Sequence, residues 1–117
     1  MATVQFSVET AVLFDKAARL RVEGELDAHT CAAMEDALSD LLEFTCFIIV
    51  DLKELRYLSS AGAGALVNSS VAAHARGGKL VLLNLAPAVR QMLSLLGLDG
   101  VLSVAESEES ALQEMRT

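Results

Sequence analysis

From residue 18 onward, short apolar runs alternate with segments of helical periodicity, and this order constrains the fold more than any other feature. The run Cys46 to Leu52 is apolar at nearly every position, as in a central strand that is covered on both faces. A helical segment, Ser60 to Arg76, follows and ends at two glycines, and Leu80 to Leu83 is a second apolar run. This alternation predicts an α/β domain with one mixed central sheet.

The first strands are expected before residue 27. Arg19 to Leu26 alternates between apolar and charged residues, which is typical of a half-buried strand. Val4 to Val8 and Ala11 to Phe14 are predicted to be two short strands that turn around Glu9-Thr10. A last short strand is expected over Val101 to Val104.

About four helices are expected to pack on the sheet. Apolar residues recur at helical spacing from Thr30 to Leu42, and Pro87 suits the first turn of a helix that runs to Leu96. Ser107 is expected to cap a final helix, with two glutamates near its positive end. The apolar residues at the end of the Pro87 helix, namely Met92, Leu95 and Leu96, are assigned to the core.

Length and composition indicate one domain that spans residues 1–117. With 53% hydrophobic residues, the chain can bury a core without a disulfide or a metal ion. Cys31 and Cys46 lie in apolar contexts and are expected to be buried free thiols. His29 and His74 lack the spacing of a metal site, and no phosphate-binding or dinucleotide loop is present, so no metal or cofactor is expected.

Charge and hydropathy exclude two classes of partner. The formal net charge is −7 and the basic residues are scattered, so binding to nucleic acid is not expected. No apolar run approaches the roughly 20 residues that a membrane span needs. The segment MATVQFSVET has neither a basic nor a long apolar region, so a secretory signal is not expected either. We therefore expect a cytoplasmic location.

Two serines stand directly before the Ser60 helix, and only alanine and glycine follow them in its first turn. Serine is a preferred helix N-cap, so an ordinary cap is one interpretation of Ser59 and Ser60. The other interpretation is a switch, because a hydroxyl at an exposed helix start, with nothing bulky behind it, is open to another protein.

A serine hydrolase is a poor interpretation of the same residues. A nucleophile elbow needs glycine two positions before and after the serine, and GxSxG is absent here. His74 lies about 14 residues after Ser60 on the same helix, and at a rise of 1.5 Å per residue it would be roughly 20 Å away. His29 alone could approach Ser60 as a base. Because the elbow is absent and His74 is too far away, we expect a protein that is not an enzyme.

Four ordered motifs resemble those of one protein family. DLKELRYLSSAGAGAL, Asp51 to Leu66, resembles the signature of anti-sigma factor antagonists, which are single-domain proteins with the STAS fold. That signature ends in an aromatic, an aliphatic, Asp-Ser-Ser/Thr-Gly-Leu-Gly. The three other segments are GELDAHT, RGGKLVLLNLAPAVRQMLSLLGL and ESEESAL. Together they cover nearly the whole chain and imply a single STAS-type domain.

The resemblance implies a partner-switching protein. Such a protein binds an anti-sigma factor that is also a serine kinase of the GHKL type, and phosphorylation of one serine releases it. A PP2C-type phosphatase restores binding. The phosphorylated serine corresponds to Ser60, with Ser59 as the alternative. The implied partner-binding residues are Glu25, Asp27, His29, Ser59, Ala61, Gly62, Ala63 and Gly64.

Some alternatives stay open at this point. The family has an aspartate where this chain has Ser59, and a serine or threonine where it has Ala61. Asp27 has a second possible role, which is to cap the helix that follows it. A STAS scaffold, or a regulator of another pathway such as secretion without a sigma factor output, is the alternative function. The protein is expected to be a monomer or a weak dimer.

Overall fold

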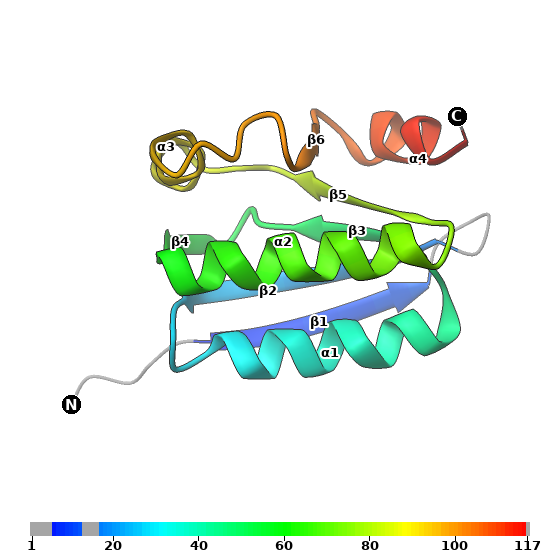
Figure 1. Cartoon of the computed structure of the whole chain (residues 1–117), viewed down its shortest axis with the longest axis horizontal. Helices are drawn as coiled ribbons and strands as arrows, with labels where there is room; N and C mark the ends of the chain where they lie inside the picture. Colours follow the sequence, from blue (N-terminus) through cyan, green and yellow to red (C-terminus); the bar gives the residue numbers. More distant parts are fainter. Residues whose placement is uncertain (1–5, 13–16, 117) are drawn as a thin grey trace.

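The computed structural model describes residues 6–12 and 17–116, and in this part of the chain six strands form one sheet (Figure 1). The elements in chain order are β1 (Phe6–Val12), β2 (Ala18–Leu26), α1 (Cys31–Phe44), β3 (Phe47–Asp51), β4 (Leu55–Leu58), α2 (Ser60–Ala75), β5 (Lys79–Leu83), α3 (Pro87–Leu95), β6 (Ser103–Ala105) and α4 (Glu108–Arg116). The strand order is β1-β2-β3-β5-β6, and β4 pairs with β2.

The sheet is mixed, as the sequence predicts. β1 pairs with β2 antiparallel, and all other neighbouring strands are parallel. β2 is long enough for two parallel partners on one side. Its first half, Ala18–Arg21, pairs with β3, and its last residues, Gly24–Leu26, pair with β4. β4 therefore lies beside the end of β2 from which the chain turns toward α1.

Helices cover both faces of the sheet. One face packs against α1, α2 and α3 and forms the larger core, to which β2 contributes Leu20 and Val22. The other face packs against α4, with Ile49 and Val81 among its buried residues. α1 and α2 also pack against each other. The α/β class with four helices on a mixed sheet is thus confirmed.

The observed elements correct two predictions at finer scale. Glu9 and Thr10 do not form a turn, because β1 runs through them and each pairs with a residue of β2. The other ends of the two predicted strands, residues 4–5 and 13–14, lie outside the described residues. Leu95 and Leu96 are not core residues, since they are 74% and 39% exposed at the end of α3, whereas Met92 is partly buried.

β4 is the element that the sequence pattern did not predict. It has four residues and follows a turn that contains Lys53 and Glu54, so no alternation is long enough to identify it. Its stability comes from pairing with β2, including a bond from the Gly24 amide to the Glu54 carbonyl. β4 leads directly into α2, and it therefore sets the position of the two serines.

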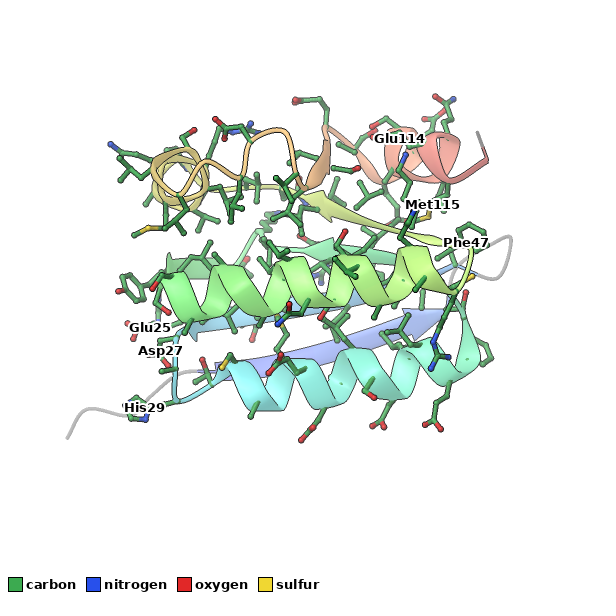
Figure 2. The ribbon with its side chains drawn as sticks, in the orientation of Figure 1. Glu25, Asp27, His29, Phe47, Glu114 and Met115 are labelled. Carbon is green, nitrogen blue, oxygen red and sulfur yellow. The ribbon has the colours of Figure 1, made fainter. Side chains whose placement is uncertain are left out.

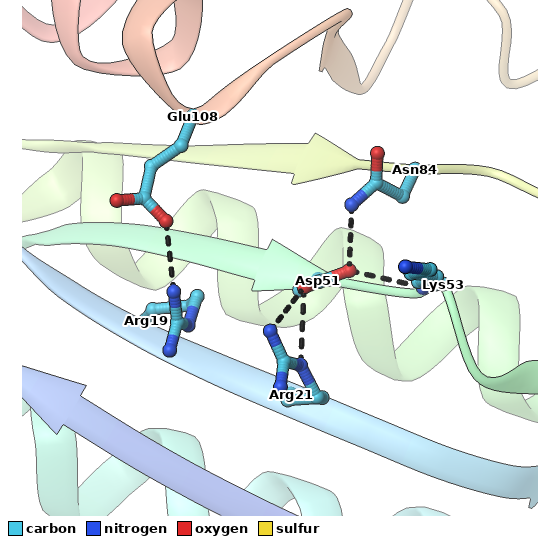
Figure 3. Close-up of polar contacts among 6 residues, drawn as sticks. All are labelled: Arg19, Arg21, Asp51, Lys53, Asn84 and Glu108. Carbon is cyan, nitrogen blue, oxygen red and sulfur yellow. Dashed lines mark hydrogen bonds and ion pairs between the residues drawn. The ribbon is translucent and has the colours of Figure 1, made fainter.

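A buried carboxylate fixes the turn between β3 and β4 (Figure 3). Asp51 accepts hydrogen bonds from Arg21 Nε, Asn84 Nδ2 and the Lys53 amide at 3.2, 3.1 and 3.0 Å. Asn84 has a φ of 60°, a left-handed conformation that asparagine tolerates better than most residues. These bonds join the middle of β2 to the carboxyl ends of β3 and β5 around one side chain.

α4 begins as the sequence predicts. The Ser107 hydroxyl accepts a hydrogen bond from the Ser110 amide, and Glu108 and Glu109 occupy the first turn.

Among the described residues, no helix is both long enough and apolar enough to cross a membrane.

Candidate functional site

The two serines lie where β2 and β4 end. Leu26 pairs with Leu58 at the last position of both strands. One residue further on, the Ser59 amide donates a hydrogen bond of 2.9 Å to the Leu26 carbonyl. The end of β2 is therefore bonded directly to the residue that precedes α2. The loop after β2 and the start of α2 lie next to each other for this reason.

The predicted loop residues share this end of the molecule (Figure 2). Glu25, Asp27 and His29 are drawn beside the starts of α1 and α2, whereas Phe47 lies at the opposite end. Glu25 and His29 are exposed, and Asp27 is partly buried. The structure thus brings together the two segments, residues 25–29 and 59–64, that the sequence predicted to form one surface.

Ser59 is the N-cap of α2. Its backbone is extended, and its Oγ accepts a hydrogen bond of 3.2 Å from the Gly62 amide. Its carbonyl accepts the Ala63 amide at 2.9 Å, which is the first bond of the helix. The cap interpretation is therefore confirmed for Ser59, whose amide, hydroxyl and carbonyl all hold the start of α2 in place.

The amide and the hydroxyl of Ser60 make none of the bonds that those groups of Ser59 make. It is the first residue of α2 and is exposed. Within the described residues, its hydroxyl has no hydrogen-bond partner. The amides of Ser60 and Ala61 likewise receive no acceptor from the part of the chain that is described. The helix start therefore combines a free hydroxyl with two free N–H groups, and the latter favour negative charge.

The two glycines of the first turns have different surroundings. Gly62 is buried, and a Cβ there would lie 2.6 Å from the Leu26 carbonyl oxygen. Gly64 is exposed, and a Cβ there would meet nothing within 4 Å. Gly62 is therefore needed so that α2 can begin against the end of β2. Packing inside the domain gives no comparable reason for Gly64.

This difference corrects the predicted partner-binding surface. Ala61 and Gly64 face solvent, and Ser59 is partly accessible. Gly62 and Ala63 are buried against the sheet, so they cannot present atoms to a partner. A helix in contact with a sheet turns part of every turn inward, which is why a continuous run of small residues overstates the exposed surface.

The glycine pair gives a direct test of this geometry. We expect Gly62→Ala to lower the free energy of unfolding by about 2 kcal/mol, because the new methyl group meets a backbone oxygen that cannot move aside alone. Gly64→Ala is the matched control, and we expect it to raise stability by roughly 0.5–1 kcal/mol through its helix propensity. Urea denaturation measures both values. Equal effects of the two substitutions would contradict the close contact between Gly62 and the end of β2.

Asp27 organises the loop between β2 and α1. Its Oδ1 accepts the amides of His29 and Thr30 at 2.9 and 3.1 Å. The hydroxyl of Thr30 donates to the Glu25 carbonyl and accepts the Asp27 amide. The bond from the His29 amide is the main reason that the pKa of Asp27 lies below its ordinary value, while partial burial opposes the shift. Asp27 therefore caps the turn that precedes α1, whose own N-cap residue is Thr30.

Two arrangements that the sequence analysis considered are not found among the described residues of the site. No three of the His, Cys, Asp and Glu side chains in the described ranges converge as metal ligands. His74 stands in the last turn of α2, at the far end of the helix from Ser60. An exposed hydroxyl at a helix start, on a smooth surface beside an ordered acidic loop, is suited to modification and to contact with another protein.

Known proteins resemble this chain in sequence and in fold. The family model of the STAS domain matches residues 11–111. The chain is 26% identical to the anti-sigma F factor antagonist of Paenibacillus polymyxa over 98 residues, which is 82% of this chain and 84% of that protein.

Two solved structures show the same fold in a related protein. The unphosphorylated form of the anti-sigma factor antagonist SpoIIAA has a TM-score of 0.75 and 27% identity, and the match covers 96% of each chain. The phosphorylated form of the Bacillus cell fate determinant SpoIIAA has a TM-score of 0.67 and 25% identity, covering 94% of this chain and 98% of that one.

Proposed function

The chain belongs to the STAS domain family, and we propose that it is an anti-sigma factor antagonist whose binding is switched by phosphorylation of Ser60. Two observations support the proposal. The similar proteins carry this name, and one of them is known in phosphorylated and unphosphorylated forms. The observation that carries it in this chain is the free, exposed hydroxyl of Ser60 at the start of α2.

Ser60, rather than Ser59, is the proposed acceptor. The Ser59 hydroxyl caps α2, and a phosphate there would remove the bond from the Gly62 amide. The amide and carbonyl of Ser59 also hold the start of α2, through bonds to Leu26 and Ala63. A phosphate on Ser60 disturbs none of these bonds, because its oxygen points into solvent. A kinase can reach Ser60 without unwinding the helix.

The phosphate would act by occlusion. It adds about −1.5 to −2 charges at pH 7, and the free amides of Ser60 and Ala61 can stabilise it. The domain therefore stays folded. Glu25 and Asp27 already make the neighbouring loop acidic, so a partner that binds this surface would have to bury added negative charge next to carboxylates. Burying charge without a partner costs several kcal/mol.

The proposed contact surface consists of the exposed part of the predicted set. It contains Glu25 and His29 from the loop, and Ser59, Ser60, Ala61 and Gly64 from α2. Asp27 acts mainly by holding the loop in place. Because Gly64 and Ala61 project little or nothing from the helix, the backbone of a partner can approach α2 closely.

The proposed partner is an anti-sigma factor that is also a GHKL-type serine kinase, and a PP2C-type phosphatase would reverse the modification. Both would meet this chain in the cytoplasm. In this scheme the chain catalyses nothing itself. It competes with a sigma factor for the kinase while it is unphosphorylated.

Mapping of the phosphorylation site tests the assignment. The chain is incubated with ATP, Mg²⁺ and the GHKL-type anti-sigma kinase encoded in the same genome, and phosphopeptides are identified by mass spectrometry. We expect one phosphate on Ser60, none on Ser60→Ala, and full modification of Ser59→Asn, in which asparagine keeps the cap. Phosphate on Ser59, or modification of Ser60→Ala, would overturn the choice of acceptor.

A further inference from the structure

Tyr57 is an exposed aromatic residue three positions before Ser60. It lies in β4 and exposes 47% of its surface. Within the described residues, its hydroxyl has no hydrogen-bond partner. Neither the core nor the cap of α2 uses this side chain. β-branched residues are also favoured in strands, so strand propensity alone does not require an aromatic ring here.

The pairing of β4 with β2 determines the face on which Tyr57 stands. Tyr57 is opposite Glu25, and Leu58 is opposite Leu26. The two leucines belong to the core that α1 and α2 cover. Because successive side chains of a strand point to opposite faces, Tyr57 and Glu25 stand on the other face of the sheet. The register shifts between Gly24 and Glu25, so Arg56 has no partner in β2. Tyr57 still pairs with Glu25.

α3 contacts β4, but its buried residues belong to the core on the Leu58 face and not to the face of Tyr57. α4 is the helix that packs there, and its buried contacts are with β3, β5 and β6. Figure 1 shows α4 and β4 at opposite ends of the sheet. The ring of Tyr57 and the carboxylate of Glu25 therefore form an exposed step at the end of the sheet. Ser60 follows Tyr57 by three residues and begins α2 at the same end of the sheet.

We infer that Tyr57 is an anchor residue for the anti-sigma kinase, which would contact both the start of α2 and the opposite face of the sheet at β4. The inference rests on the proposed function and extends its surface. Tyr57 and Ser60 are separated by roughly 10 Å of extended chain, so one protein can cover both. Tyrosine supplies large apolar area and a polar hydroxyl at little entropic cost, and it is enriched among residues that dominate binding.

The position of Tyr57 favours this partner over a second copy of the chain. Its neighbour in the sheet, Glu25, precedes Leu26, whose carbonyl accepts the Ser59 amide, so the step and the switch lie at the same end of β2. A protein that senses Ser60 must lie against this end of the sheet. Self-association through Tyr57 would instead appear as an increase in mass at high concentration, independent of the kinase.

Isothermal calorimetry with the GHKL-type anti-sigma kinase of the same genome tests the inference. Tyr57→Thr keeps strand propensity and removes the ring, and we expect its Kd to rise tenfold or more. Phe44→Ala is the matched control, because Phe44 is 63% exposed and lies with Phe47 at the opposite end of the molecule. We expect the control to bind within twofold of the wild-type chain.

The outcomes separate this inference from the proposed function. If the wild-type chain binds and Tyr57→Thr weakens binding by less than fivefold, the anchor role is overturned while the proposed function stands. If the wild-type chain does not bind, the proposed function fails and the inference fails with it. Thermal melting of each variant shows whether it is folded, and Tyr57→Phe should retain most of the affinity if the ring provides the contact. Light scattering of the chain alone should show no dimer that Tyr57→Thr removes, and such a dimer would overturn the inference.

Discussion

Asp51→Ala should lower the free energy of unfolding by about 3 kcal/mol, because it removes a buried carboxylate that accepts hydrogen bonds from Arg21, Asn84 and the Lys53 amide. The Asp51 side chain is 3% exposed and bonds Arg21, Asn84 and the Lys53 amide. Removal of one member of a buried ion pair typically costs 3–5 kcal/mol. Arg21 is 34% exposed and can regain some water, so we expect the lower end of that range.

The ion pair between Arg19 and Glu108 provides the control for this prediction (Figure 3). It has an N–O distance of 2.8 Å, but its side chains are 22% and 39% exposed. Glu108→Ala should therefore cost no more than about 1 kcal/mol. Urea denaturation compares the two variants in one assay. Equal losses would show that Asp51 does not hold the turn between β3 and β4 in the manner described.

The position of this carboxylate connects stability to function. The turn after Asp51 leads into β4, and β4 delivers Ser59 and Ser60 to the end of β2. A chain with a loosened turn would still contain the serines but would hold them less firmly. We therefore expect Asp51→Ala to bind the kinase more weakly as well.

The class of the fold could be predicted from hydropathy alone, and the pairing could not. The apolar run at Ile48 and the alternation around Val22 identify strands because burial on two faces or one leaves a clear pattern. β4 could not be predicted in this way, because its four residues are too few to show a pattern and the strand forms by pairing with β2. The sequence predicts two strands in place of β1, because Glu9 and Thr10 resemble a turn. Their pairing with β2 shows that the strand continues through them.

The site was partly predictable for similar reasons. Serine at a helix start indicates a cap or a switch, and the sequence cannot assign the two roles. The structure assigns the cap to Ser59 through the Gly62 amide and leaves the Ser60 hydroxyl free. Gly62 and Gly64 look alike in the sequence, and only the position of Leu26 distinguishes them. Tyr57 was part of the motif, but its exposure depended on the face that its partner in β2 would select.

Modification of Ser60 should have the largest effect on binding. We expect Ser60→Asp to raise the Kd for the anti-sigma kinase at least 100-fold, because a carboxylate would be buried in an already acidic contact. This corresponds to about 2.7 kcal/mol. Ser60→Ala should bind as tightly as the unmodified chain and should remain bound in the presence of ATP. Its methyl group fits a helix start that is already lined with small residues.

A second acidic substitution on α2 separates the effect of position from that of total charge. Asn68 is exposed on α2, and it lies about two turns beyond Ser60, or roughly 12 Å along the helix axis. Asn68→Asp adds the same charge to the same helix. It should change the Kd by less than fivefold, because it lies outside the proposed contact. A comparable loss from both substitutions would point to general repulsion instead of a switch.

Calorimetric titration of the anti-sigma kinase with the unphosphorylated chain, and with the chain phosphorylated on Ser60, tests the central claim most directly. Both samples should have the same melting temperature within a few degrees, since the phosphate lies on a free helix start. The account predicts tight binding by the unphosphorylated chain and a Kd at least 100-fold higher for the phosphorylated one. Equal affinity of the two forms would contradict it.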